Sequence, residues 1–170
     1  MSVSASVAPP RGFTRLGLFA YLVAVAGLLL DQASKYWVVD VLHLTAQGMT
    51  VPILPFFRLT MVWNVGVSYG LLSAQNLIQS WSLVIFSFVI AIGLGIWVRN
   101  QVRWPTAVAI GLIMGGAVGN ALDRARFQHV VDFLDFSGAH FPWVFNIADS
   151  CISVGVVILL LDSFVTRKPA

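Results

Sequence analysis

The chain has 170 residues, of which 58% are hydrophobic and 10% are charged, and its mean hydropathy is +0.87. A soluble domain carries about 25% charged residues, so this composition excludes a soluble domain and indicates an integral membrane protein. The net charge is +3, but the basic residues are scattered in ones and twos, which argues against nucleic-acid binding. The length leaves room for one compact membrane domain, over residues 1–170.

A first membrane helix is predicted near the N-terminus. An uncharged apolar run over residues 16–30 follows two arginines and looks at first like a secretory signal peptide. The run continues past the small residues at 24–26, where cleavage would fall, and Tyr36 and Trp37 supply the aromatic belt of a complete span. We therefore expect a retained helix over about residues 14–38.

Asp31 and Lys35 lie near the far end of this helix, within the sequence DQASK. Their spacing of four residues places them on one helix face, where opposite charges meet. The ordinary interpretation is an ion pair at the membrane interface, in which the lysine stem extends towards water.

Residues 40–63 differ in character, because Pro52 and Pro55 break helices and the sequence around them is rich in β-branched and aromatic residues. We expect short strands here, lying at the membrane surface. The sequence NVGVSYG follows at 64–70, where asparagine and glycine suit an ordinary hairpin turn but can also expose backbone donors.

Three more spans are predicted, over about residues 77–98, 104–122 and 142–162. In the middle one of these, glycine recurs every fourth residue on one helix face, at Gly111, Gly115 and Gly119. Small residues at this spacing let helix backbones approach closely in lipid, so they indicate a packing seam rather than a ligand loop. The expected fold class is an all-α membrane protein with four transmembrane helices and a small β-rich extracytoplasmic segment between helices 1 and 2.

The basic residues predict the orientation of the chain. They flank the helix ends that four spans would place on one side, which should be the cytoplasm: Arg11, Arg15, Arg99, Arg103, Arg167 and Lys168. Both termini are then cytoplasmic, and all the aspartates except Asp162 fall towards the outer leaflet. At about 1.5 Å of rise per residue, Asp149 would lie roughly 10 Å inside the fourth helix.

Asp132 and Asp149 are the candidate chemical groups, since a buried carboxylate is costly unless it is paired, protonated or facing a wet cavity. If the chain returns sharply between them, they form two carboxylates that share one proton and activate a water molecule. Two other interpretations stay open. One is a structural ion pair with Arg124 or Arg126, and the other is a proton or ion relay in a transporter.

The lone cysteine, Cys151, does not indicate nucleophilic or metal chemistry. No histidine lies at helical spacing from it, and one cysteine cannot make a disulfide or, by itself, a thiolate metal site. We interpret it as a small buried filler. The sequence contains no glutamate, and no spacing of aspartate and histidine resembles a metal site, so we expect no metal.

Five sequence blocks occur in order along the chain: DQASK, NVGVSYG, GGAVGNALDR, HVVDF and FNIADS. In this order they resemble the bacterial lipoprotein signal peptidases, also called signal peptidase II, from Asp31 to Ser150. The resemblance implies a four-helix inner-membrane aspartyl endopeptidase that uses no cofactor. It also implies cleavage of prolipoproteins on the N-terminal side of a cysteine that carries a diacylglyceryl group. The implied partners are these substrates and membrane lipids, with no nucleic acid and no obligate protein partner.

The resemblance assigns roles to particular residues. The family's catalytic pair maps onto Asp132 of HVVDF and Asp149 of FNIADS. Substrate binding or structural support is implied for Asp31, Lys35, Asn64, Gly66, Asn120, Asp123, Arg124 and Asn146. One block departs from the family pattern, which often has Ala-Phe where this sequence has Ser68-Tyr69. That departure concerns the shape of the substrate pocket and leaves the catalytic pair unchanged.

Two other classes of protein share some of these features. A small drug–proton antiporter would also have four spans and an intramembrane acid, but it would be expected to carry that acid in the first span and to lack a strand-rich segment. A structural or assembly factor would not need two acids converging near one depth.

Overall fold

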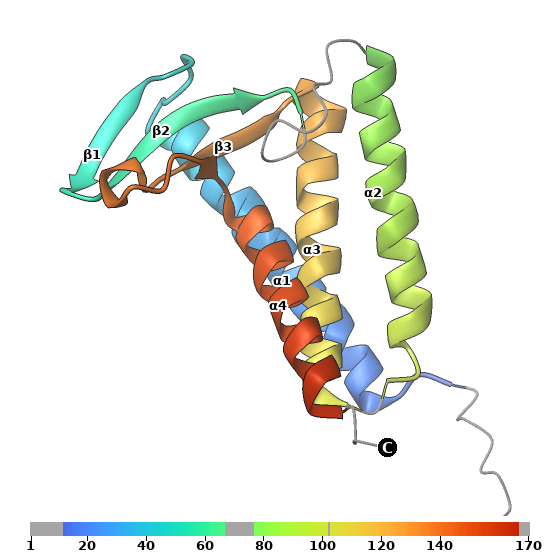
Figure 1. Cartoon of the computed structure of the whole chain (residues 1–170). Helices are drawn as coiled ribbons and strands as arrows, with labels where there is room; N and C mark the ends of the chain where they lie inside the picture. Colours follow the sequence, from blue (N-terminus) through green and yellow to red (C-terminus); the bar gives the residue numbers. More distant parts are fainter. Residues whose placement is uncertain (1–11, 67–76, 102, 167–170) are drawn as a thin grey trace, which may run out of the picture.

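The computed structural model of the protein describes residues 12–66, 77–101 and 103–166. Four long helices form the body of this part of the chain: α1 (Arg15–Tyr36), α2 (Leu77–Val98), α3 (Trp104–Phe127) and α4 (Ile147–Thr166). Each is long and apolar enough to cross a membrane. They run side by side in one bundle (Figure 1), so the prediction of four apolar helices is confirmed.

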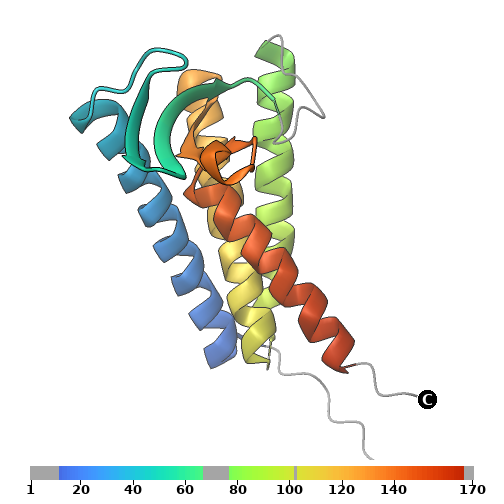
Figure 2. The same cartoon turned by 60° about the vertical axis from the view of Figure 1, so that its left-hand side comes forward.

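A small antiparallel sheet lies at one end of the bundle, called the sheet end below (Figures 1 and 2). Its strands, in spatial order, are β1 (Thr50–Leu54), β2 (Phe57–Asn64), β3 (Val130–Asp135) and β4 (Val144–Phe145). Only β1 and β2 come from the chain between α1 and α2, whereas β3 and β4 lie between α3 and α4. The predicted strands between the first two helices are present as β1 and β2, but the sheet is not confined to that segment, because β3 and β4 follow the third helix.

The sheet is attached to the bundle by a cluster of apolar side chains from the segment that follows α1 and from β2 and β3. It consists of Val38, Leu44, Leu59, Met61, Val131 and Phe133. Alternate residues of a strand face opposite sides, so Val131 and Phe133 turn towards this cluster while Asp132 between them turns away from it. The alternation therefore places one aspartate on the other face of β3.

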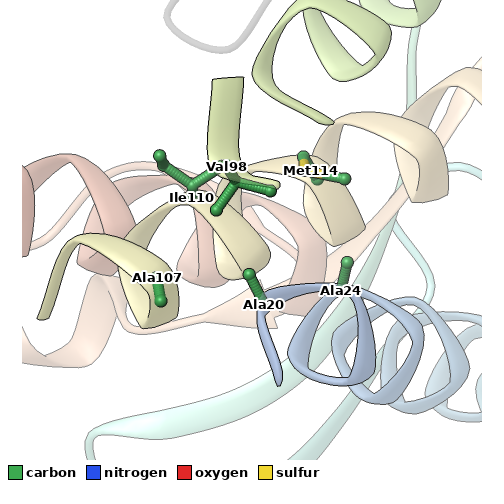
Figure 3. Close-up of a cluster of buried hydrophobic side chains, with 6 residues drawn as sticks. All are labelled: Ala20, Ala24, Val98, Ala107, Ile110 and Met114. Atoms are coloured by element: carbon green, nitrogen blue, oxygen red, sulfur yellow. The ribbon is translucent and has the colours of Figure 1, made fainter. Parts of the chain in front are cut away.

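The central helix of the bundle is α3, which packs against all three of the others. Its apolar stretch is 61% buried within the protein, against 11–28% for the other helices. Figure 3 shows the small and medium side chains that meet between α1, α2 and α3: Ala20, Ala24, Val98, Ala107, Ile110 and Met114. The remaining helices leave wide apolar faces exposed, as helices in contact with lipid do.

The glycines of α3 are a packing seam, as the sequence predicts. A Cβ atom added to Gly115 would lie 2.4 Å from the carbonyl oxygen of Ala24 in α1, and one on Gly111 would lie 2.5 Å from that of Ala20. On a second face, a Cβ on Gly116 would lie 2.4 Å from the carbonyl oxygen of Ala148 in α4. Both neighbouring backbones thus contact α3 where it has no side chains.

We expect Gly115→Ala to lower the thermal stability of the protein in detergent, because the new methyl group meets α1 backbone that cannot rotate away. Overpacking of this kind costs about 1–3 kcal/mol. The matched control is Gly93→Ala in α2, where an added Cβ would meet nothing within 4 Å and the stability should be unchanged or slightly higher. Equal melting temperatures for the two variants would show that the seam is not closely packed.

Two helix boundaries differ from the prediction, and both affect the site. The helix α3 continues to Phe127 rather than about 122, and it ends where Gln128 adopts a left-handed conformation with φ of 63°. The helix α4 begins at Ile147 rather than about 142, because Val144 and Phe145 pair with β3. Asp149 therefore lies in the first turn of α4, and not about 10 Å inside the helix as predicted.

Candidate active site

A cavity of about 1420 Å³ lies between α2, α3 and α4, beneath the sheet. Its walls are mainly apolar and include Phe86 and Ile90 of α2, Ile113 of α3 and Ile152 of α4. Polar side chains gather at its sheet end, namely Asn64, Asn120, Arg124, Asp132 and Asp149. The two aspartates singled out by the sequence thus face one cavity, although they come from a strand and a helix.

Asp132 lies in β3, the strand that follows α3. It is almost completely buried, and both of its carboxylate oxygens accept hydrogen bonds from amide groups. Asn146 Nδ2 lies 2.6 Å from Oδ1, and Asn64 Nδ2 lies 2.8 Å from Oδ2. These two donors fix the plane of the carboxyl group.

Asp149 is held at the start of α4 by the residue that precedes the helix. The Asn146 side-chain oxygen accepts a hydrogen bond from the Asp149 backbone N–H at 2.8 Å, which is the contact of a helix N-cap. The Asp149 carboxylate in turn accepts from Asn120 Nδ2 at 2.8 Å. Asn146 therefore contacts both members of the pair, one through its oxygen and the other through its nitrogen.

The three asparagines have only one possible amide orientation, because each side-chain oxygen faces a group that can only donate. Asn64 Oδ1 accepts from the Gly66 N–H, Asn146 Oδ1 from the Asp149 N–H, and Asn120 Oδ1 from the Lys35 ammonium. Each NH2 group must then point towards a carboxylate of the pair. The three amides thus donate to both acids without themselves adding a buried charge.

The proton affinity of Asp132 is raised by its surroundings. Burial, with the neighbouring Asp149 charge adding to it, raises the pKa of Asp132 to about 7, against the opposing influence of the two amide donors and of Lys35. A carboxyl group with this pKa holds a proton for a large part of the time at neutral pH. Two carboxylates that share a cavity and one proton can act together as an acid and a base.

Arg124 lies in the last turns of α3 and lines the cavity, but it does not pair with Asp123. Its Nη2 donates to the Gly66 carbonyl oxygen at 2.7 Å, and its Nη1 lies 3.4 Å from the Asn120 carbonyl oxygen. Among the ion pairs of the described residues, none joins an aspartate to Arg124 or Arg126. The described residues therefore show no direct ion pair between an aspartate and Arg124 or Arg126, although the Arg124 charge interacts with Asp149 and Asp132.

Asp31 and Lys35 form an ion pair, but not the interfacial pair that the spacing suggests. Their side chains are only 0% and 5% exposed, and Lys35 Nζ lies 2.8 Å from both Asp31 Oδ2 and Asp123 Oδ2. The interpretation as a snorkelling lysine is wrong because the ammonium points into the bundle, where α3 supplies the second acid. Asp123 thus pairs with a lysine from α1 rather than with its sequence neighbour.

Two polar groups were missed by the sequence analysis. Gln32 Nε2 donates to Asp31 Oδ2 at 3.1 Å and to Asp123 Oδ1 at 3.0 Å, so it joins the same two acids as Lys35. Its position beside Asp31 in the DQASK block was the only signal. Asp135 belongs to a separate polar cluster at the end of β3.

Asp135 is a structural acid outside the cavity. Its Oδ2 accepts from Arg58 and from Thr60 at 2.7 Å, and its Oδ1 accepts from the Ser137 N–H at 2.9 Å. Although burial acts in the opposite direction, these hydrogen bonds hold the pKa of Asp135 well below its usual range. It is therefore ionised at neutral pH, whereas Asp132 three residues earlier holds a proton for a large part of the time.

Cys151 does not line the cavity; its sulfur faces Gly27 of α1 at packing distance. In the part of the chain that the structure describes, no group of three or more His, Cys or Asp side chains could hold a metal ion. We expect Cys151→Ala to keep most of the activity, and thiol reagents and chelators not to inhibit directly. A folded Cys151→Ala protein without activity would contradict this account of the residue.

The remaining site residue of the sequence analysis, Gly66, is buried at the edge of the cavity, where its backbone contacts Asn64 and Arg124. Ser68 and Tyr69 lie outside the described residues. The site therefore brings together all ten residues singled out from the sequence. Five of them line the cavity. The other five lie behind its wall and contact the lining residues or their neighbours in the backbone.

The fold and the site together define a class of protein, a multi-pass membrane protein with two aspartates at the polar end of an apolar cavity. The family model described as signal peptidase (SPase) II matches residues 23–165 of this chain. The chain belongs to the signal peptidase II family, and it is a peptidase.

Individual relatives agree with this assignment. The chain is 48% identical over 161 residues to the lipoprotein signal peptidase of Caulobacter vibrioides. The matching region covers 94% of this chain and 95% of that protein. It is 45% identical over 152 residues to the lipoprotein signal peptidase of Methylorubrum extorquens, at 88% and 85% coverage. A solved structure described as a bacterial membrane enzyme superposes with a TM-score of 0.75 at 30% identity, covering 94% of this chain and 96% of that one.

Proposed function

We propose that this protein removes the signal peptide from diacylglyceryl-modified prolipoproteins, cleaving on the N-terminal side of the lipidated cysteine. The observation that carries the proposal is the pair of aspartates, Asp132 and Asp149, at the polar end of a large apolar cavity. The names of the relatives support the substrate class. One chain then supplies both the lipid-compatible surface and the hydrolytic groups.

The two aspartates act on a water molecule held between them and the scissile peptide. The ionised carboxylate of Asp149 takes a proton from the water, whose oxygen attacks the peptide carbonyl carbon. Protonated Asp132 donates its proton to the carbonyl oxygen, so that a neutral tetrahedral gem-diol forms. The proton on Asp149 then passes to the leaving amide nitrogen of the cysteine, the C–N bond breaks, and a hydroxyl proton returns to Asp132.

The neutral amides suit this chemistry because they hold the carboxyl groups without neutralising them. Asn120 donates to Asp149, whereas Asn64 and Asn146 donate to Asp132. Asp132 is kept near its point of half-protonation by burial and by Asp149. The environments of the two acids are thus different, which favours one acid and one base rather than two equivalent groups.

The shape of the cavity supports a lipidated substrate. Its walls are mainly apolar side chains of three helices, with a few serines among them, and its charged and amide groups lie at the sheet end. Acyl chains gain nothing from polar walls, whereas a peptide backbone needs donors and acceptors in a buried site. We therefore place the acyl chains along the apolar walls and the extended peptide beside the sheet and Arg124, whose fixed guanidinium has further N–H groups for a carbonyl or ester oxygen.

We place the protein in the bacterial inner membrane, with the sheet end and its two aspartates near the outer leaflet. Arg15 and Arg99 lie at the opposite end of the bundle, and basic residues favour the cytoplasmic side. A reporter that is active only in the cytoplasm should therefore give a strong signal when fused after Ala170. Normal expression of this fusion without any signal would contradict the orientation or the number of spans.

The test of the proposed function uses one prolipoprotein in two forms, with and without the diacylglyceryl group on its cysteine. Purified protein should convert the lipidated form to a shorter product whose new N-terminus is the modified cysteine. The unmodified form should be cleaved far more slowly. Cleavage of neither form by folded protein, or cleavage at another bond, would contradict the proposal.

A further inference from the structure

We infer that Lys35 is a positioning residue for the reaction, whose ammonium group fixes the two backbone segments that carry the catalytic aspartates relative to each other. This inference rests on the proposed function. Lys35 has three N–H donors and is almost fully buried, and three acceptors surround it: Asp31 Oδ2, Asp123 Oδ2 and Asn120 Oδ1. Each of these three residues also contacts the catalytic pair or the residue next to one of its members.

The first connection passes through Asp31 to the helix that carries Asp149. Asp31 Oδ2 lies 2.8 Å from the Lys35 ammonium, and its other oxygen accepts a hydrogen bond from the Ala148 backbone N–H at 2.8 Å. Ala148 precedes Asp149 in the first turn of α4, where backbone N–H groups lack partners within the helix. Asp31 thus fixes the start of α4 to α1.

The second connection passes through Asp123 to the strand that carries Asp132. Asp123 Oδ2 lies 2.8 Å from the same ammonium and accepts a hydrogen bond from the Val131 backbone N–H at 3.1 Å. Val131 precedes Asp132 in β3. The two connections therefore have the same form: in each, a carboxylate joins Lys35 to the backbone N–H just before a catalytic aspartate.

The third connection passes through Asn120 to Asp149 itself. Lys35 Nζ lies 3.2 Å from Asn120 Oδ1, and Asn120 Nδ2 donates to Asp149 Oδ1 at 2.8 Å. Because the ammonium can only donate, it forces the amide to present its NH2 group to the carboxylate. Lys35 therefore helps to orient a donor that touches a catalytic group, together with Asn146, whose Nδ2 donates to the same oxygen at 3.1 Å.

Lys35, Asp31 and Asp123 do not line the cavity that the described residues form, so they do not touch a substrate that occupies it. An effect of these residues on the reaction must act through the positions of Asp132 and Asp149. Displacing a catalytic group by about 1 Å can cost on the order of 10²-fold in rate. We therefore expect changes at Lys35 to lower kcat and to leave KM nearly unchanged.

Lys35 also contributes to the charge around Asp132. That carboxyl group faces Asp149 from α4, Lys35 from α1 and Arg124 from α3, together with the amides of Asn64 and Asn146. The lysine favours the ionised form of Asp132, so its removal should shift the alkaline limb of the pH–rate profile to higher pH. A role confined to global stability would not move this limb.

The experiment compares two variants with a control at the other end of the bundle. Lys35→Met removes the ammonium but leaves two acids unpaired, so we add the triple variant Asp31→Asn, Lys35→Met, Asp123→Asn. The triple variant buries no unpaired charge, and its new amides keep an oxygen for the Ala148 and Val131 N–H groups. The control is Asp162→Asn, which removes a partly buried acid bound to Arg103 and Thr106 at the opposite end of the bundle.

We expect the triple variant to fold and to lose at least about tenfold in kcat, with KM within about twofold of the original value. Folded Lys35→Met should show the same loss and the shifted alkaline limb. Asp162→Asn should melt earlier while its kcat, KM and pH profile stay unchanged.

Three results would overturn the inference. They are an unchanged kcat in the folded triple variant, a rise in KM without a fall in kcat, or a triple variant that does not fold, since the three residues would then stabilise the whole bundle rather than the site. Absence of cleavage by the unmodified protein would instead contradict the proposed function, so the two failures are distinguishable.

Discussion

Asp149→Asn and Asp132→Asn are each expected to abolish cleavage of the lipidated prolipoprotein while the protein stays folded. An amide keeps the shape of the side chain but cannot take a proton from water or share one with its partner. Loss of one acid–base group typically costs about 10²–10⁴-fold. The two single variants should lose activity to a similar extent, because neither aspartate can act without the other.

A matched control comes from the same strand. Asp135→Asn removes a buried acid three residues from Asp132, but one that binds Arg58 and Thr60 outside the cavity. This variant should melt earlier, and its folded fraction should cleave at the original rate. Near-normal turnover by either Asp132→Asn or Asp149→Asn, measured on folded protein, would remove the paired-aspartate mechanism.

The rate of cleavage should fall about tenfold for each pH unit above the pKa of about 7 that burial and Asp149 give Asp132. The sign follows from the role of the residue: Asp132 must be protonated to donate to the carbonyl oxygen, so activity is lost as the pH rises through this value. The rate should also fall in acid, because the mechanism needs one ionised carboxylate in the pair as the base. The profile should therefore be bell-shaped, with two apparent pKa values that belong to the pair.

This measurement must report on the chemical step. Single-turnover reactions with excess protein exclude product release, and unfolding at each pH is checked by the recovery of activity after return to neutral pH. A rate that stays constant from acid to alkaline pH, with chemistry shown to be limiting, would contradict the assignment of an acid and a base to the pair.

The sequence predicts the helices well because a membrane span leaves a strong signal. An apolar stretch of about 20 residues is needed to cross the bilayer, and little else in a short chain has this length. The glycine seam of α3 was also predictable, since Gly111 and Gly115 recur at the spacing of one helix face. Both features depend on residues that are near one another in sequence.

The features that the sequence did not predict depend on contacts between distant segments. The strand β3 is buried on both faces, so VVDFLD lacks the alternation that marks a half-exposed strand. The buried position of Lys35 depends on Asp123, which lies 88 residues later in the chain. Spacing within one helix cannot distinguish such a residue from an interfacial lysine.

The candidate site also has one part that the sequence predicts and another that depends on contacts between distant segments. The resemblance to known motifs identified the residues, but it could not say that Asp132 lies on a strand and Asp149 in the first turn of a helix. Those positions follow from the pairing of β3 with β4 and from the cap at Asn146. The connection from Lys35 to both aspartates is visible only when α1, α3, α4 and the sheet are assembled.

The shared proton is the central claim of this account, and infrared difference spectroscopy tests it most directly, because a protonated carboxyl group has a carbonyl stretch that its ionised form lacks. The original protein should show such a band that disappears as the pH rises through about 7. The band should be missing in Asp132→Asn, and in Asp149→Asn it should disappear at lower pH, since the neighbouring negative charge is gone. A band that titrates identically in the original protein and in Asp132→Asn would contradict the claim that Asp132 holds the proton.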